Sequence, residues 1–378
     1  MREVVVIGVG MTPFGKSDKT VMQLGAEAAR LALLDANILQ REIEAGYCGS
    51  VYADMLLGQK IFKQVGIDGL PVYNLENACS SGATAFHEAY LAIASGRFDT
   101  ALVVGAEKLT ALGSGTIPLD LNDHEVRQGL NMPAIYAMRA IRYMEEYGLT
   151  RETLAKVTVK SRKNASLNHY APYRKTITVE EVLNSRLIAY PITLPQCCPA
   201  VDGGAAAVLC STQVSKKYTS NPIKILVSEL TSGRYTNGYR DMTIPEITVR
   251  SAKEAYKLAG IGPEDVDLAE VHDAFSIAEL LYYEALQFCE RGGAPRLLED
   301  GHTEIGGKIA VNPSGGLLSK GHPLGATGIA QIFEIITQLR GKAGERQVPN
   351  AKVGLTHCTG GGIAGFDHGA CSIHIFER

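Results

Sequence analysis

A glycine-rich turn followed by a helical pattern occupies residues 312–328, which read NPSGGLLSKGHPLGATG. The Gly325-Ala326-Thr327 in this stretch repeats the Gly82-Ala83-Thr84 that begins another helical pattern in the first half of the chain. A second pair of segments agrees with this repeat. Residues 28–38 resemble residues 251–261, and each is an amphipathic helical pattern followed by an acidic turn. The sequence therefore predicts an internal duplication.

Short apolar runs alternate with the helical patterns along the chain. Continuous apolar strands of this kind are typical of α/β proteins whose sheets are covered by helices on both faces. We therefore expect two related α/β halves packed as pseudo-twins, residues 1–110 with 201–225 and residues 226–378. The expected strands are Val4–Ile7, Ala101–Val104, Ala205–Leu209 and Ile223–Val227, with others near Ser50–Ala53, Leu268–His272 and Lys352–Thr356.

A segment of different character, residues 111–200, separates the two parts of the first half. It holds two helical patterns, Pro133–Tyr147 and Thr150–Asn168, and then a basic, turn-rich stretch. Thr150 is a suitable N-cap for the second pattern, since its hydroxyl can accept a hydrogen bond from a free backbone N–H. We interpret this segment as an inserted loop domain.

Composition excludes several classes of protein. The 378 residues are 46% hydrophobic, and 37 Lys and Arg against 40 Asp and Glu give a net charge of −3, so the chain has no overall positive field to bind nucleic acid or an anionic membrane. Eight cysteines without a Cys-x-x-Cys pair favour neither a disulfide scaffold nor a zinc site. No run approaches the ~20 apolar residues of a membrane helix, and no targeting segment is visible at Met1. We expect a protein of the reducing cytoplasm.

Cys79 lies among small residues immediately before the first of the repeated helical patterns. Free backbone N–H groups and the positive end of the helix dipole would stabilise a thiolate there, which favours a nucleophile. His322 holds nearly the same position before the repeated helix. If a pseudo-twofold axis relates the halves, the two helix starts converge and the thiol meets a base.

Two further residues point to the same place. Cys358 follows the last apolar strand and precedes Gly360-Gly361-Gly362, whose backbone could approach a substrate and present N–H groups to an oxyanion. This cysteine suggests acid–base chemistry. His272 closes an expected strand of the second half and could face the same interface.

The chain resembles the thiolases, and more closely their sterol-carrier-protein-like branch. Four motifs in order carry the resemblance: Asn77–Gly82, His272–Phe275, Gly321–Gly328 and Cys358–Gly362. His272 marks the branch, because other thiolases have Asn-Glu-Ala-Phe at this place. The resemblance implies the thiolase fold, a five-layered αβαβα arrangement of two duplicated halves with an inserted loop domain.

The resemblance also implies a role for each residue. Cys79 would attack the 3-oxo carbon of a 3-oxoacyl-CoA and carry the acyl group as a thioester, and His322 would take its proton. Cys358 would protonate the departing carbon and later deprotonate coenzyme A. His272 and His322 would hold the thioester oxygen, while the N–H groups of Cys79 and Gly360 would hold the oxyanion. The reaction is thiolysis, or Claisen condensation in reverse.

Coenzyme A is the expected co-substrate, and no metal is expected in this chain. Its phosphates need a local basic patch, for which Arg174, Lys175, Ser232 and Arg234 are the main candidates. Other candidates in the inserted segment are Lys160, Arg162, Lys163 and Arg186. The resemblance further implies a homodimer and a small zinc-ribbon/OB-fold partner subunit, with no nucleic-acid or membrane partner.

Several alternatives stay open. Among similar proteins are acetoacetyl-CoA thiolases and a thiolase subunit that splits benzoylsuccinyl-CoA. Both an aryl or branched acyl group and a short one are therefore open as the substrate's acyl group. Leu119, Leu121, Met132 and Tyr136 are candidate pocket walls. A β-ketoacyl synthase would lack Cys358, and a retro-aldol lyase would not need an acylated Cys79. A non-catalytic subunit that binds acyl-CoA or lipid is disfavoured because all four motifs are intact.

Overall fold

The computed structural model describes residues 1–113, 115–219, 221–234, 240–361 and 367–378. Ten of its strands form one sheet in the order β10-β9-β11-β12-β8-β1-β7-β4-β2-β3. The strands of the first half are β1 (Val4–Met11), β2 (Ala45–Gly49), β3 (Val72–Leu75), β4 (Thr100–Lys108) and β7 (Asp202–Ser211). Those of the second half are β8 (Ile223–Ser232), β9 (Leu268–Glu270), β10 (Ala310–Val311), β11 (Val353–Gly360) and β12 (Ala370–Glu377).

The strand order repeats between the halves, which confirms the duplication. Counted along the chain within each half, the strands lie in the order third, second, fourth, fifth, first, and the same neighbours are parallel or antiparallel in both. The first strands of the two halves, β1 and β8, pair antiparallel at Val5–Lys224 and Val6–Ile223. The halves therefore share one hydrogen-bonded sheet.

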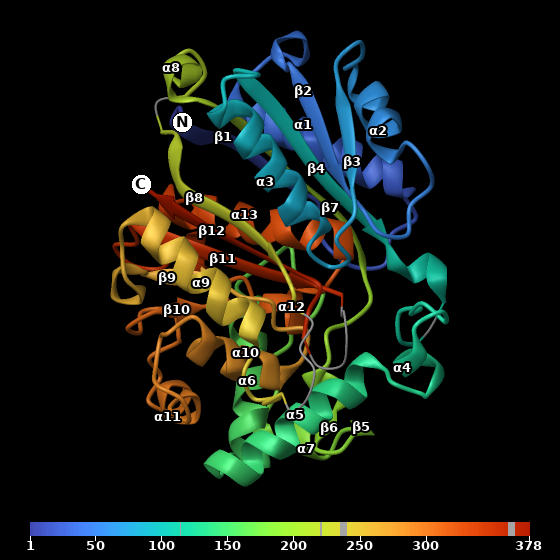
Figure 1. The fold of residues 1–378 in the computed structure, drawn as a ribbon, viewed down its shortest axis with the longest axis vertical. Helices are drawn as coiled ribbons and strands as arrows, with labels where there is room; N and C mark the ends of the chain where they lie inside the picture. The colour runs from blue at the N-terminus through green and yellow to red at the C-terminus, as the bar shows by residue number, and fades with distance from the viewer. Residues whose placement is uncertain (114, 220, 235–239, 362–366) are drawn as a thin grey trace.

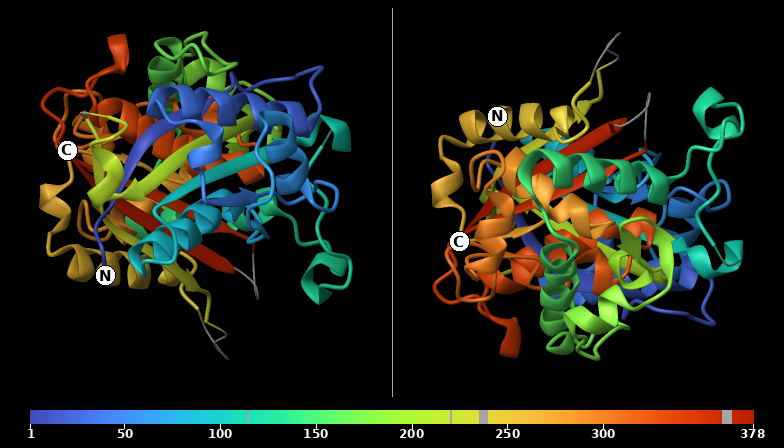
Figure 2. Two further views of the ribbon diagram at one scale, coloured as in Figure 1. Left: turned by 90° about the horizontal axis from the view of Figure 1, so that it is seen from above. Right: turned by 90° about the horizontal axis from the view of Figure 1, so that it is seen from below.

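The helices and the two halves of this sheet form five layers, with helices outside each half of the sheet and between the halves. The helices concerned are α1 (Val21–Ala36), α2 (Leu57–Val65), α3 (Ser81–Ala94), α9 (Glu246–Ala259), α10 (Ser276–Ala285) and α13 (Leu324–Leu339). α1 and α2 cover the outer face of the first half, and α9 covers that of the second, with α10 packed beside it. α3 and α13 contact each other and strands of both halves, so they form the central layer (Figure 1). Both chain ends lie on the same side of the molecule (Figure 2).

The two central helices cross at the repeated glycines. A Cβ on Gly82 would lie 2.3 Å from the carbonyl oxygen of Gly325, and a Cβ on Gly328 would lie 2.6 Å from the Cβ of Ala83. Any larger residue would push the backbones apart, because such separations are far inside van der Waals contact. Glycine therefore brings the beginnings of α3 and α13 together.

The inserted segment packs on the second half. It contains α4 (His124–Arg127), α5 (Met132–Tyr147), α6 (Arg151–Ser166), α7 (Val179–Leu183) and the hairpin β5 (Leu187–Ala189) with β6 (Ile192–Thr193). α5 and α6 contact α10, α11 (Ala294–Glu299) and α12 (Gly316–Lys320), at the end of the molecule remote from β2 and β3 (Figure 1). The predicted cap is confirmed, since the Thr150 hydroxyl accepts a hydrogen bond from the backbone N–H of Thr153.

Two sequence predictions differ from the structure. The strand expected near Ser50–Ala53 is wrong, because β2 ends at Gly49 and the N–H groups of Val51 and Tyr52 donate to the buried carboxylate of Glu107. The boundary expected between residues 225 and 226 falls inside β8. Among the described residues, no helix is long and apolar enough to cross a membrane. The remaining short elements are α8 (Thr212–Ser215) and 3₁₀ turns at Gln40–Glu42, Leu109–Leu112, Leu194–Gln196, Pro263–Asp265 and Gly344–Arg346.

Candidate active site

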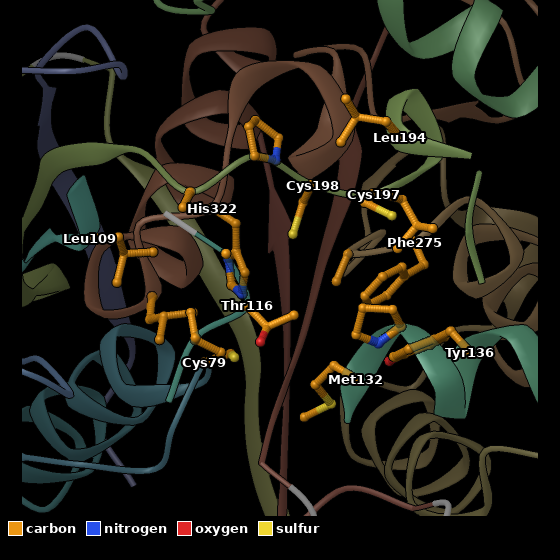
Figure 3. Close-up of a pocket in the computed structure, with 18 of the residues that line it drawn as sticks. Cys79, Leu109, Thr116, Met132, Tyr136, Leu194, Cys197, Cys198, Phe275 and His322 are labelled. Atoms are coloured by element: carbon orange, nitrogen blue, oxygen red, sulfur yellow. The ribbon is translucent and has the colours of Figure 1, made fainter. Parts of the chain in front are cut away.

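The beginnings of α3 and α13 bring a thiol and an imidazole together at the junction of the two halves. Donor atoms of Cys79, His272 and His322 all lie within 4.8 Å of one another, and the three side chains are buried. Figure 3 shows Cys79 and His322 on one side of a cavity and Phe275 and Tyr136 on the other. The predicted close approach of the Cys79 thiol and the His322 ring is therefore confirmed. One thiol and two imidazoles could also ligate Zn²⁺, and the described residues contain no second group of this kind.

Cys79 sits in a tight turn before α3. Ala78 has a φ of 49°, a left-handed conformation that is rare for a residue with a side chain and that is typical of functional turns. Burial raises the pKa of the Cys79 thiol to about 12, while the N–H groups of Gly361 and of Cys79 itself offset part of this rise. Loss of hydration therefore opposes the thiolate that the helix start is expected to stabilise.

The ring of His322 is oriented by the first turn of α13, the helix that follows it. Its Nδ1 atom lies 2.7 Å from the Thr327 hydroxyl, whose proton is donated to the carbonyl of Pro323 at 3.0 Å. The hydroxyl must then accept from Nδ1–H, so Nε2 keeps its lone pair. That buried Nε2 has no hydrogen-bond partner, and burial lowers the pKa of His322 to about 3. His322 is thus a neutral base beside a neutral thiol.

Cys358 and His272 complete the cluster. The Cys358 sulfur lies 3.3 Å from the carbonyl oxygen of Cys79 and 3.5 Å from Nδ1 of His272. The His272 and His322 rings meet edge to face with centroids 4.8 Å apart. Burial, followed by the nearby His322 and His368, holds the pKa of His272 well below its usual value. Burial also raises the pKa of Cys358 well above that of a free thiol.

Buried carboxylates tie the His272 loop to the glycine-rich segment. Asp273 accepts hydrogen bonds from the backbone N–H groups at the start of α12, 2.6 Å to Leu317 and 3.4 Å to Leu318. Glu270 accepts from the N–H and hydroxyl of Ser314 at 3.0 Å and 2.6 Å. These bonds hold the segment that leads into His322 against the strand that leads into His272.

The structure distinguishes two neighbouring glycines. Gly360 ends β11 where a Cβ would lie 2.0 Å from the carbonyl oxygen of Asn77, so only glycine fits beside the Cys79 turn. It is Gly361, however, that lines the cavity and whose N–H acts on the Cys79 thiol. The resemblance implied this role for the N–H of Gly360. Gly362 lies outside the described residues.

The cavity has a volume of about 610 Å³ and a mostly apolar wall. Three of the four expected wall residues, Leu119, Met132 and Tyr136, line it, whereas Leu121 is 72% exposed and does not. The Tyr136 and Phe275 rings stack with centroids 4.5 Å apart. Several other residues line the cavity without having been predicted from the sequence, namely Lys16, Cys197, Cys198, Thr359 and His368. Cys197 and Cys198 lie outside the four motifs that carry the resemblance, and no local pattern in the sequence singles out His368.

Comparison with known proteins agrees with this arrangement. Residues 4–213 match the family described as thiolase, N-terminal domain, and residues 228–368 match thiolase C-terminal domain-like. The chain belongs to the thiolase family. It is 44% identical to benzoylsuccinyl-CoA thiolase subunit BbsB of Thauera aromatica, over 96% of this thiolase and 95% of the relative. It is 42% identical to an acetyl-CoA acetyltransferase of Methanothermobacter thermautotrophicus, over the full length of both.

A solved structure with the same fold extends the comparison. The thiolase matches the structure titled Ltp2-ChsH2(DUF35) aldolase with a TM-score of 0.86 and 27% identity, over 98% of this chain and 97% of that one. That relative is named as an aldolase. The fold therefore serves more than one kind of carbon–carbon chemistry, and the residues of the site must decide between them.

The solvent-facing end of the cavity carries positive charge. Exposed Lys16 and Arg186 line it beside Tyr173, which is followed in the chain by the exposed Arg174 and Lys175. Ser232 and Arg234 are exposed and do not line the described part of the cavity. Lys160 cannot serve the thiolase as a phosphate ligand, because it is buried and pairs with Glu279 at 2.8 Å.

Proposed function

We propose that this thiolase cleaves a 3-oxoacyl-CoA with coenzyme A, through an acyl group carried on Cys79. The overall reaction is R–CO–CH₂–CO–SCoA + CoA–SH → R–CO–SCoA + CH₃–CO–SCoA, and its reverse is a Claisen condensation. The observation that carries the proposal is the free lone pair of His322 beside the Cys79 thiol. A thiol next to an oriented base is the arrangement that acyl transfer requires.

The first step forms the acyl-enzyme. The Cys79 sulfur attacks the 3-oxo carbon while Nε2 of His322 takes the thiol proton, so no free thiolate is needed in the buried site. In this proposal the N–H groups of Cys79 and Gly361, which act on the Cys79 thiol, donate to the oxyanion that forms. Collapse of the tetrahedral species breaks the bond between carbons 2 and 3 and leaves the acyl group on sulfur.

The second task is to stabilise and protonate the carbon that departs. His272, together with the newly protonated His322, donates to the thioester oxygen, on which the enolate charge develops. Cys358 delivers the proton to carbon 2, since it lies beside both His272 and the Cys79 backbone. Cys358 then takes the proton of an incoming coenzyme A, whose thiolate attacks the acyl group on Cys79. The bond between the acyl carbon and the Cys79 sulfur breaks, and His322 returns its proton to that sulfur.

Coenzyme A enters in this proposal as a substrate, and its phosphates meet the basic groups at the solvent-facing end. Lys16 and Arg186 line the cavity there, with Arg174 and Lys175 close by in the chain. Ser232 and Arg234, on the loop after β8, are weaker candidates because they do not line the described part of the cavity. The apolar wall built on the stacked Tyr136 and Phe275 favours an aryl or branched acyl group over a short one.

The test is a thiolysis assay with purified protein. Incubation with an aryl 3-oxoacyl-CoA, acetoacetyl-CoA and coenzyme A should yield two thioesters, and intact-protein mass spectrometry without coenzyme A should find the acyl group on Cys79. Cleavage of the matching aryl 3-hydroxyacyl-CoA without coenzyme A, with release of an aldehyde or ketone, would instead assign an aldolase. Binding of acyl-CoA without cleavage would assign a non-catalytic subunit.

The proposal extends to assembly. A homodimer, with a small zinc-ribbon/OB-fold subunit bound to it, is expected from the resemblance, and the aldolase relative is titled with a DUF35 partner. Light scattering on the purified chain should report the mass of a dimer. Full thiolysis by the chain alone would remove the need for a partner subunit.

A further inference from the structure

Three side chains of the candidate active site also form a set of metal ligands. The Cys79 sulfur and one ring nitrogen each of His272 and His322 all lie within 4.8 Å of one another. A tetrahedral Zn²⁺ with bonds of about 2.0–2.3 Å holds its ligand atoms about 3.5 Å apart, so movements of about 1 Å would close the three on one ion. All three residues line the cavity, so an ion can reach them from its solvent-facing end.

The His322 ring is already held as a metal ligand is held. It is 5% exposed, and its Nε2 atom has no hydrogen-bond partner among the described residues. Its Nδ1–H is donated to the Thr327 hydroxyl, whose own proton goes to the carbonyl of Pro323. A hydrogen bond on the far nitrogen of the ring is what fixes the tautomer and orientation of the histidines that bind zinc. The lone pair of Nε2 is therefore available to an ion.

The donor set selects the kind of ion. Thiolate and imidazole ligands suit Zn²⁺, whereas Mg²⁺ and Ca²⁺ need oxygen ligands. No acidic side chain lines the described part of the cavity. Three protein ligands leave the fourth position of a tetrahedral ion to water, as in catalytic zinc sites. The chemistry of the cluster thus favours Zn²⁺ over a hard cation.

We propose that Zn²⁺ binds to Cys79, His272 and His322 and reversibly inhibits the thiolase. The step is Cys79–SH + Zn²⁺ → Cys79–S–Zn⁺ + H⁺: the sulfur–hydrogen bond breaks, a sulfur–zinc bond forms, and the proton goes to solvent with no change of oxidation state. The ion occupies the sulfur that attacks the substrate and the lone pair that takes the thiol proton. Binding follows from the geometry of the ligands, whereas the inhibition rests on the proposed function.

Co²⁺ tests the ligands without any substrate. Added to the reduced protein, it should bind one ion per chain and give a thiolate-to-cobalt charge-transfer band, which Zn²⁺ then removes by displacing it. Cys79→Ser should abolish the band. His322→Gln should weaken Zn²⁺ binding about a hundredfold or more, and Thr327→Val, which removes only the hydroxyl that holds His322, about tenfold. Cys289→Ser, at a half-buried cysteine outside the cavity lining, is the matched control and should keep both the band and the affinity.

Inhibition is measured on the acylation step, because free coenzyme A would itself bind Zn²⁺. Acylation of Cys79 by acetyl-CoA is followed by intact-protein mass spectrometry. At a Zn²⁺ concentration about ten times the dissociation constant, acylation should slow about tenfold, and a chelator should restore it. Protein that is acylated first should bind no Co²⁺, because an acylated sulfur has no negative charge to offer the ion.

The outcomes separate this inference from the function on which it rests. Absence of the charge-transfer band, or a band that persists in Cys79→Ser, overturns the ion site and leaves thiolysis intact. Zn²⁺ that binds through these ligands but leaves acylation unchanged overturns the inhibition. Failure of every acyl-CoA to acylate Cys79 in zinc-free protein overturns the proposed function, while the cobalt band would still support the ion site.

Discussion

The Nδ1 atom of His322 and the hydroxyl oxygen of Thr327 lie 2.7 Å apart, with His322 just before α13 and Thr327 in its first turn. The Thr327 proton is committed to the carbonyl of Pro323, so this contact selects the tautomer of His322 whose Nε2 lone pair is free. Thr327 is therefore a positioning residue for the base that receives the Cys79 proton.

Replacing Thr327 by valine should lower kcat about tenfold or more, since the base loses its orientation and tautomer. Thr327→Ser should restore most of the activity because it keeps the hydroxyl. Thr337→Val is the control, since the Thr337 hydroxyl on the same helix donates only to the carbonyl of Phe333, outside the cavity lining. Equal kcat values for the valine and serine variants would contradict the positioning role.

Cys358→Ser should separate the two halves of the reaction. A serine hydroxyl is a far weaker acid than a thiol, so overall thiolysis should fall about a hundredfold or more. Acylation of Cys79 by a simple acyl-CoA should persist, because that step needs no proton at carbon. Mass spectrometry of the acylated protein and steady-state rates measure the two effects. Cys289→Ser, at a half-buried cysteine that does not line the cavity, should leave both unchanged.

Cys79→Ser should abolish acyl-enzyme formation and lower thiolysis about a thousandfold or more, because an alcohol beside a neutral imidazole is a poorer nucleophile. The measurement is the mass of the protein after incubation with substrate and no coenzyme A. Turnover close to that of the wild-type protein would discard the covalent mechanism.

Gly82→Ala should lower the free energy of unfolding by about 2 kcal/mol, because its Cβ would meet the backbone carbonyl of Gly325 at 2.3 Å. Separation of α3 from α13 should also slow acylation of Cys79. Gly66→Ala provides the comparison, since a Cβ there meets no atom within 4 Å and only the positive φ of 82° opposes it. Gly66→Ala should lower the free energy of unfolding, measured by urea denaturation, by less than Gly82→Ala does. It should leave the rate of Cys79 acylation unchanged.

Stability should fall on the acid side of neutrality. Burial lowers the pKa of His322, His357 and His374 to about 3 and that of His368 to about 4, so the folded protein keeps these rings neutral. The unfolded chain binds protons at a pKa of about 6.5. The stabilisation is therefore complete above about pH 6.5 and is lost progressively as the pH falls towards the folded-state values. Urea denaturation should show that the free energy of unfolding decreases from pH 7 to pH 5, and His374→Asn should make this decrease smaller.

The sequence predicted the duplication and the convergence of Cys79 and His322 because both follow from local patterns. Small residues before a helix, repeated in the two halves, specify where each helix begins, and a symmetric packing brings those beginnings together. The β2 strand escaped prediction because Ala45–Gly49 is short and small, whereas the more apolar run after it uses its backbone to bind Glu107. Cation candidates were the least predictable, since a lysine such as Lys160 looks exposed until its partner Glu279 is placed.

The sequence by itself determined the order of the motifs, the residue types that act, and the doubling of the fold. Only the tertiary structure decided which N–H faces the thiol, that burial keeps Cys79 and His322 neutral, and how close His272 lies to both. The reason is physical. Local propensities act over a few neighbouring residues, whereas burial and charge depend on side chains that are distant in the chain and close only after packing.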